Sequence, residues 1–163
     1  MNATSVADAT PRRDITRRLV VINSAAFVVM AIHDADHVRQ AKNMGYHMPV
    51  HVAAILLSAY VPLLASIWWA CHGHPLRATT ATATVTGGVL VLLSVVHLVG
   101  VGQIWAPLGE VFGMWGMSYW QMHVDAVSWA AFVLLAASYA GLLMATLRVR
   151  RELRIAHLQP TSR

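Results

Sequence analysis

The sequence predicts an all-α fold, an integral membrane four-helix bundle with both termini in the cytoplasm. Three observations predict it: the composition, four apolar stretches without charge, and the uneven placement of basic residues. Of the 163 residues, 57% are hydrophobic and 12% are charged, against roughly 25% charged residues in an ordinary soluble domain. Because so few charges cannot cover a water-facing surface, we expect the exterior to face lipid. The composition also excludes intrinsic disorder, and the single cysteine excludes a disulfide scaffold.

The apolar stretches define four spans within one membrane domain, residues 1–163. A helix needs about 20 residues to cross the ~30 Å hydrocarbon core. On this basis the predicted spans cover residues 17–37, 50–71, 79–101 and 124–147, with a flexible basic tail over 1–16 and a second basic tail over 148–163. Gly100, Gly102 and Pro107 end the third helix near Val101. The Trp- and Met-rich segment that follows, residues 102–122, is expected to be interfacial.

The first span is the shortest apolar run, with fourteen uncharged residues from Leu19 to Ile32. It crosses the membrane only if the helix continues through the polar residues 33–37. A cleavable secretory signal peptide, with residues 12–18 as its basic region, is the alternative. His33 and Ala35 are not the pair of small residues that signal peptidase prefers, which favours a retained span.

The basic residues give the orientation, because cytoplasmic loops and tails carry an excess of Lys and Arg. Those at the two ends of the chain and in the loop after the second span are Arg12, Arg13, Arg17, Arg18, Arg77, Arg148, Arg150, Arg151, Arg154 and Arg163. Only Arg39 and Lys42 fall on the other side. Both tails are therefore expected in the cytoplasm, and the basic charge is explained without nucleic acid. The preference for arginine is typical of GC-rich bacteria, so we expect a bacterial cell membrane and contact with its lipid.

Histidines and acids gather at the outer ends of all four spans. His33 and His37 lie four residues apart, on one helix face. Ionisable groups cost about 2.5–3.5 kcal/mol each at mid-bilayer, so they are usually paired or liganded. Imidazoles and carboxylates from several helices form the metal sites of helical bundles. The predicted metal ligands are His33, His37, His51, His97 and His123, with Asp36 and Asp125 as catalytic carboxylates or further ligands.

Some of these residues have simpler interpretations. A lone histidine at a helix end is more often structural, and Asp34 or Asp36 can pair with Arg39 on the same helix. Copper, zinc and iron all suit such ligands. Five methionines in the outer segments would favour copper as thioether ligands, although ordinary packing is the preferred explanation for them; they are Met44, Met48, Met114, Met117 and Met122.

Three classes of function follow from this pattern. The first is a metal-dependent membrane protein for redox chemistry, lipid or quinone-type chemistry, or metal handling, its substrate entering sideways beneath residues 102–122. The second is a b-type haem electron carrier with one outer-leaflet haem held by His33 and His97. The third is a non-catalytic accessory subunit of a larger membrane complex. Whether the chain is an enzyme, and whether it forms a homo-oligomer, stays open at this level.

Overall fold

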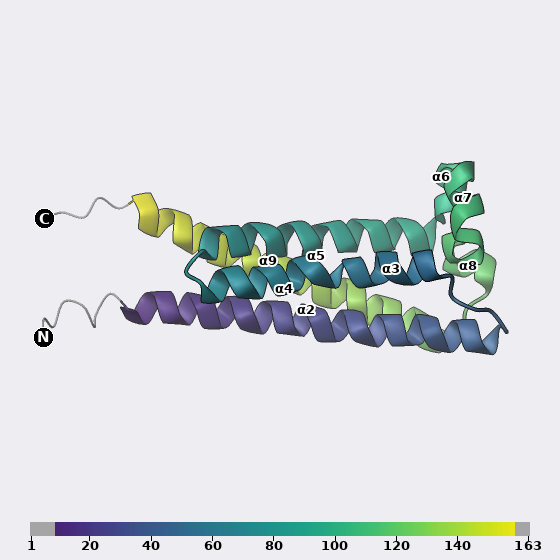
Figure 1. Ribbon diagram of the computed structural model, residues 1–163, viewed down its shortest axis with the longest axis horizontal. Helices are drawn as coiled ribbons and strands as arrows, with labels where there is room; N and C mark the ends of the chain where they lie inside the picture. The colour runs from purple at the N-terminus through teal and green to yellow at the C-terminus, as the bar shows by residue number, and fades with distance from the viewer. Residues whose placement is uncertain (1–8, 159–163) are drawn as a thin grey trace, which may run out of the picture.

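The computed structural model describes residues 9–158, and all the regular secondary structure in this part of the chain is helical (Figure 1). Four stretches are long and apolar enough to cross a membrane. They are formed by α2 (Ala9–Asn43), by α3 (Val50–Ser58) together with α4 (Tyr60–Cys71), by α5 (Pro75–Leu98) and by α9 (Ala126–Leu158). The prediction of an all-α chain with four candidate spans is thereby confirmed. The side of the membrane on which each end lies stays a prediction.

The first and last helices are longer than the predicted spans. α2 starts within the predicted flexible tail, with Pro11 in its first turn, where proline is tolerated, and runs on to Asn43. α9 continues through the predicted C-terminal tail to Leu158. No glycine or proline interrupts the residues added beyond 37 or 147. At the N-terminal end of α2, Arg18 contacts Asp14 at 2.7 Å and Glu152 of α9 at 3.1 Å. The predicted tail residues 1–8 and 159–163 lie outside the described residues.

The second span is broken near its middle, between α3 and α4. The backbone N–H of Ala59 donates to Leu56 in a tighter turn, three residues before Pro62. A proline removes one helical hydrogen bond and clashes with the carbonyl four residues earlier, here that of Ser58. α4 packs extensively on both α2 and α5, whereas α3 has few contacts apart from those with α4, which continues it along the chain.

A cap of short helices closes the end of the bundle away from the start of α2 (Figure 1). This outer cap, residues 101–122, contains α6 (Val101–Ile104), α7 (Ala106–Phe112), the 3-10 helix η1 (Gly113–Gly116) and α8 (Tyr119–Met122). The chain enters it through Gly100, whose φ of 88° favours glycine. A Cβ on Gly109 would lie 2.8 Å from the Cα of Gly102, so these two glycines allow α6 and α7 to touch.

A buried polar network lies in the other half of the bundle. This inner network consists of Asn23, Ser66 and Thr82, all with 0% exposure. Asn23 Nδ2 donates to the Thr82 hydroxyl at 3.0 Å and to the Leu19 carbonyl at 2.8 Å. The Ser66 and Thr82 hydroxyls lie 2.6 Å apart. The network therefore joins α2, α4 and α5 while satisfying its own polar atoms, as interhelical hydrogen bonds do in membrane proteins.

Candidate metal centre

Three histidines from two helices meet just beneath the outer cap. His33 and His37 lie one turn apart on α2, and His97 lies in the last turn of α5. One ring nitrogen from each lies within 4.8 Å of the others. The ring centroids are 4.5, 5.0 and 5.3 Å apart, and all three side chains are buried. We call this group the three-histidine cluster.

Hydrogen bonding leaves nitrogen atoms in the cluster free to bind a ligand. His97 Nδ1 lies 2.8 Å from the Leu93 carbonyl, to which it donates, so that its Nε2 keeps a lone pair. His97 Nε2 lies 3.4 Å from His37 Nε2. Both ring nitrogens of His33 and Nδ1 of His37 are buried and have no partner among the described residues. An unsatisfied buried polar group costs about 1–3 kcal/mol. A ligand bound to these nitrogens would remove that cost and so stabilise the folded state.

The spacing of the nitrogens suits a transition-metal ion. Imidazole nitrogen binds zinc at about 2.0–2.1 Å, which places two ligands of a tetrahedral ion roughly 3.4 Å apart. The Nε2 atoms of His37 and His97 have this separation. Three protein ligands with a fourth position left open form the usual coordination of catalytic zinc sites. The cluster could therefore hold one ion and leave a position for a second ligand.

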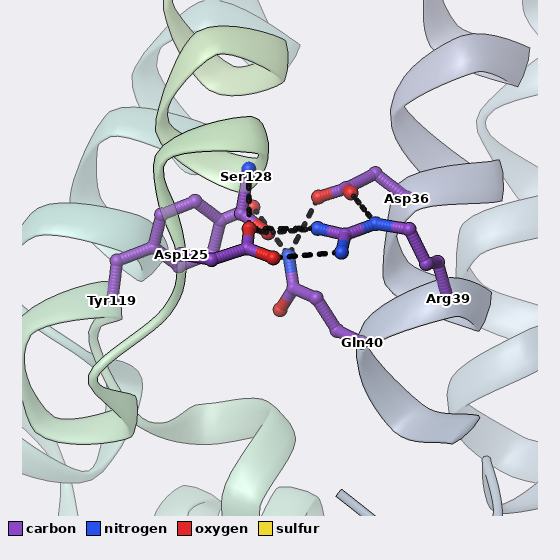
Figure 2. Close-up of polar contacts among 6 residues, drawn as sticks. All are labelled: Asp36, Arg39, Gln40, Tyr119, Asp125 and Ser128. Carbon is purple, nitrogen blue, oxygen red and sulfur yellow. Dashed lines mark hydrogen bonds and ion pairs between the residues drawn. The ribbon is translucent and has the colours of Figure 1, made fainter. Parts of the chain in front are cut away.

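The two predicted catalytic carboxylates are held by one arginine beside the cluster (Figure 2). Arg39 Nε donates to Asp36 at 2.8 Å, and its two terminal nitrogens donate to Asp125 at 2.7 and 2.8 Å. Arg39 also reaches the Ser128 hydroxyl at 2.9 Å. The alternative pairing of Asp36 with Arg39 therefore occurs, and both carboxylates form ion pairs that tie the outer ends of α2 and α9 together.

Two groups link this ion-pair network to the cluster. Gln40 donates to Asp36 at 2.7 Å and lies 3.4 Å from the Tyr119 hydroxyl. The ring of Tyr119 packs edge-on against His97, with centroids 4.4 Å apart, and burial raises the pKa of Tyr119 to about 12. At the exposed side, the hydrogen bonds from Arg39 hold the pKa of Asp125 well below its usual range. Tyr119 is thus neutral and Asp125 charged at neutral pH.

The other two predicted ligands lie outside the cluster. His51 is exposed, and its Nε2 lies 3.0 Å from the Val111 carbonyl in the outer cap. His123 is exposed and caps α8 in the left-handed conformation, with φ of 50°. Asp34, the other carboxylate considered as a partner of Arg39, instead accepts a hydrogen bond of 2.6 Å from Tyr60. The structure brings together His33, His37 and His97 from the predicted set.

An apolar cavity of about 370 Å³ adjoins the cluster. Its walls come from α2, α3, α5 and the outer cap, and they include His37 of α2 and His97 of α5. Tyr119 and Trp115 also line it, and neither was predicted as a site residue. In the sequence Trp115 is typical of an interfacial belt and Tyr119 gives no signal, and no spacing indicates that these two residues fold back over the histidines.

The comparisons with known proteins give no relative for this chain: no protein-family model, curated protein or solved structure matches it. The functional conclusion therefore depends on the chemistry of the site.

Proposed function

We propose that this chain is an integral protein of the bacterial cell membrane that binds one transition-metal ion through His33, His37 and His97. One observation carries the proposal: three buried imidazoles from α2 and α5 lie close enough to share an ion, and their nitrogens include atoms without other partners. Buried polar groups in folded proteins are almost always hydrogen-bonded or bound to a ligand. A shared ion would satisfy one nitrogen of each ring.

A metal ion fits the cluster better than a haem. Haem iron of the b type takes at most two axial ligands, one from each side of the porphyrin plane. Here the three rings pack against one another, with centroid separations of 4.5 to 5.3 Å. The third imidazole would have no part in haem ligation, whereas a bare ion uses all three.

The donor set favours zinc, copper or iron. All three bind neutral imidazole, while sites for magnesium and calcium are made of oxygen ligands. Met117 and Met122 line the adjacent cavity together with His37 and His97, and thioether sulfur is a ligand that selects copper. With the termini in the cytoplasm, as the basic residues predict, the ion lies in the outer leaflet.

The test is elemental analysis of the detergent-purified protein together with its visible spectrum. We expect one ion of zinc, copper or iron per chain and no Soret band. His33→Ala and His37→Ala are expected to lose the ion, because each removes one of three ligands. His51→Ala and His123→Ala are matched controls that change outer histidines beyond the cluster, and they should retain it.

Two results would contradict the proposal. Full metal occupancy in both His33→Ala and His37→Ala would show that other residues bind the ion. A protein that contains neither metal nor haem and co-purifies with a large membrane partner would support the accessory-subunit alternative.

A further inference from the structure

The cavity beside the three-histidine cluster has one polar corner and otherwise apolar walls. His37 and His97 form that corner with Tyr119, and His33 does not line the cavity. Side chains such as Leu93, Val96 and Phe112 form the remaining walls. An ion bound to the cluster would therefore have the cavity on the side of His37 and His97, where its open coordination position could meet a second molecule.

The mouth of the cavity opens on the lateral surface of the bundle. Ile55 on α3 and Leu92 on α5 both line the cavity, and they are 48% and 59% exposed. Both residues belong to stretches that can cross a membrane, so we expect their exposed side chains to face lipid. α3, which ends at the break before Ala59, is packed less closely than α4, and this leaves a gap between α3 and α5. A ligand would thus enter from the bilayer.

The volume limits what can enter. A cavity of about 370 Å³ holds roughly a dozen non-hydrogen atoms at the ~30 Å³ that each water occupies in the liquid. It lies at the small end of the ~300–1,000 Å³ typical of ligand pockets. A single ring or a single chain fits, and the two chains of a phospholipid do not.

The polar groups at the cavity indicate an oxygen on the ligand. The indole nitrogen of Trp115, which lines the cavity, is buried without an acceptor among the described residues. A metal ion cannot satisfy this N–H, whereas an acceptor oxygen can. A metal ion at the cluster would polarise the same kind of oxygen as a Lewis acid.

We infer that this cavity binds one lipid-soluble molecule, a single ring or single chain, with a carbonyl-type oxygen beside His37, His97 and Trp115. The inference rests on the proposed function, because the metal ion is the second partner of that oxygen. Quinones and fatty acids both have this chemistry, and they are distinguished by the experiment. The apolar walls of the cavity and its mouth on the lateral surface do not suit a water-soluble substrate.

The experiment measures binding of two radiolabelled probes, an alkyl benzoquinone and a medium-chain fatty acid, to the full-length protein in nanodiscs. Val96→Phe fills part of the cavity, and Val91→Phe makes the same change on the lipid-facing side of α5, outside the cavity. Val96→Phe should weaken binding of the preferred probe by at least about tenfold, which corresponds to ~1.4 kcal/mol of binding free energy. Val91→Phe should leave it unchanged. The metal content of every sample is measured in parallel.

A second pair of variants covers the case in which Val96→Phe disturbs folding or the neighbouring His97. Ile55→Trp narrows the mouth from α3, and Leu57→Trp adds the same bulk to α3 away from the cavity. Chelation of the metal should also weaken binding in the wild-type protein.

The outcomes separate this inference from the metal proposal. A metal-containing protein that binds neither probe, or whose cavity and control variants bind equally, overturns the cavity inference and leaves the metal site standing. A folded protein without metal overturns the metal site, and the cavity inference with it. Tighter binding of the quinone or of the fatty acid identifies the ligand class.

Discussion

The inner network and the three-histidine cluster place polar side chains at two depths of one bundle, and they differ in how those side chains are satisfied. Asn23, Ser66 and Thr82 bond to one another and to nearby carbonyls. The histidines keep buried nitrogens without partners. Both groups are buried between helices in the spans, so burial alone does not separate them.

The difference teaches that unsatisfied atoms, more than polar residues as such, indicate a binding site inside a membrane bundle. The inner network has the composition expected of helix-packing contacts, with small hydroxyl and amide groups. The cluster consists of a residue type that binds metals readily, and His97 is oriented by its hydrogen bond to the Leu93 carbonyl. The two regions should therefore respond to different perturbations.

Metal removal should have the largest effect on stability, and it should act only through the three-histidine cluster. A ligand present at ~1,000 times its Kd stabilises the folded state by about 4 kcal/mol. Chelation should therefore lower the thermal unfolding midpoint of the wild-type protein clearly, as followed by tryptophan fluorescence in detergent. His97→Ala should show a low midpoint from the start and no further change on chelation.

An equal response of the wild type and His97→Ala to the chelator would contradict this prediction, because the chelator would then act elsewhere.

Breaking the inner network should have a moderate effect on stability and none on the metal. Asn23→Ala removes the hydrogen bonds to Thr82 and to the Leu19 carbonyl. Interhelical hydrogen bonds in membrane proteins contribute about 0.6 kcal/mol on average and up to ~1.7 kcal/mol. We expect a loss of unfolding free energy in this range, measured by denaturant titration, with metal content unchanged.

Ser24→Ala, at the exposed neighbouring position, is the control and should leave stability as it is. Loss of metal from Asn23→Ala would show that the two regions are coupled.

The Arg39 ion pairs should give the smallest effect, and one that depends on pH. The pKa of Asp125 is lowered in the folded state, so its contribution is fully present above the unfolded value of about 3.9. It is lost as the pH falls further, through the lower folded pKa. The unfolding midpoint of Asp125→Asn should lie slightly below that of the wild type at neutral pH and approach it in acid.

Because Asp125 is half-exposed, added salt should also reduce the difference. Glu110→Gln changes another exposed outer carboxylate and serves as the control. A midpoint difference that grows as the pH falls would contradict the assigned sign.

The sequence predicts the helices well because their physical causes are local. Apolar length identifies the four spans, and the spacing of His33 and His37 places both on one face of α2. The third histidine of the cluster, His97, follows from its depth near the end of a span. The extensions of α2 and α9 were not predicted, because the boundaries were drawn from the length needed to cross a membrane, while helix formation continues through Arg, Gln and Glu.

The remainder of the site depends on contacts between distant segments. His123 was predicted from its position at the start of a span, but it is exposed in the turn after α8 and lies outside the cluster. Asp36 and Asp125 have the chemistry of catalytic groups, yet Arg39 bonds to both at once. Tyr119 and Trp115 reach the histidines only because the outer cap folds over them. No periodicity in the sequence predicts the direction in which such a cap folds relative to the helices.

The hydrogen bond from His97 to the Leu93 carbonyl has a mechanical consequence. It fixes the imidazole to the backbone of α5 one turn earlier, so the direction of Nε2 follows the rotation of the whole helix. Rotating α5 by a single residue position, about 100°, would turn that nitrogen away from α2. An ion held by His33, His37 and His97 would accordingly fix the rotation of α5 about its own axis relative to α2.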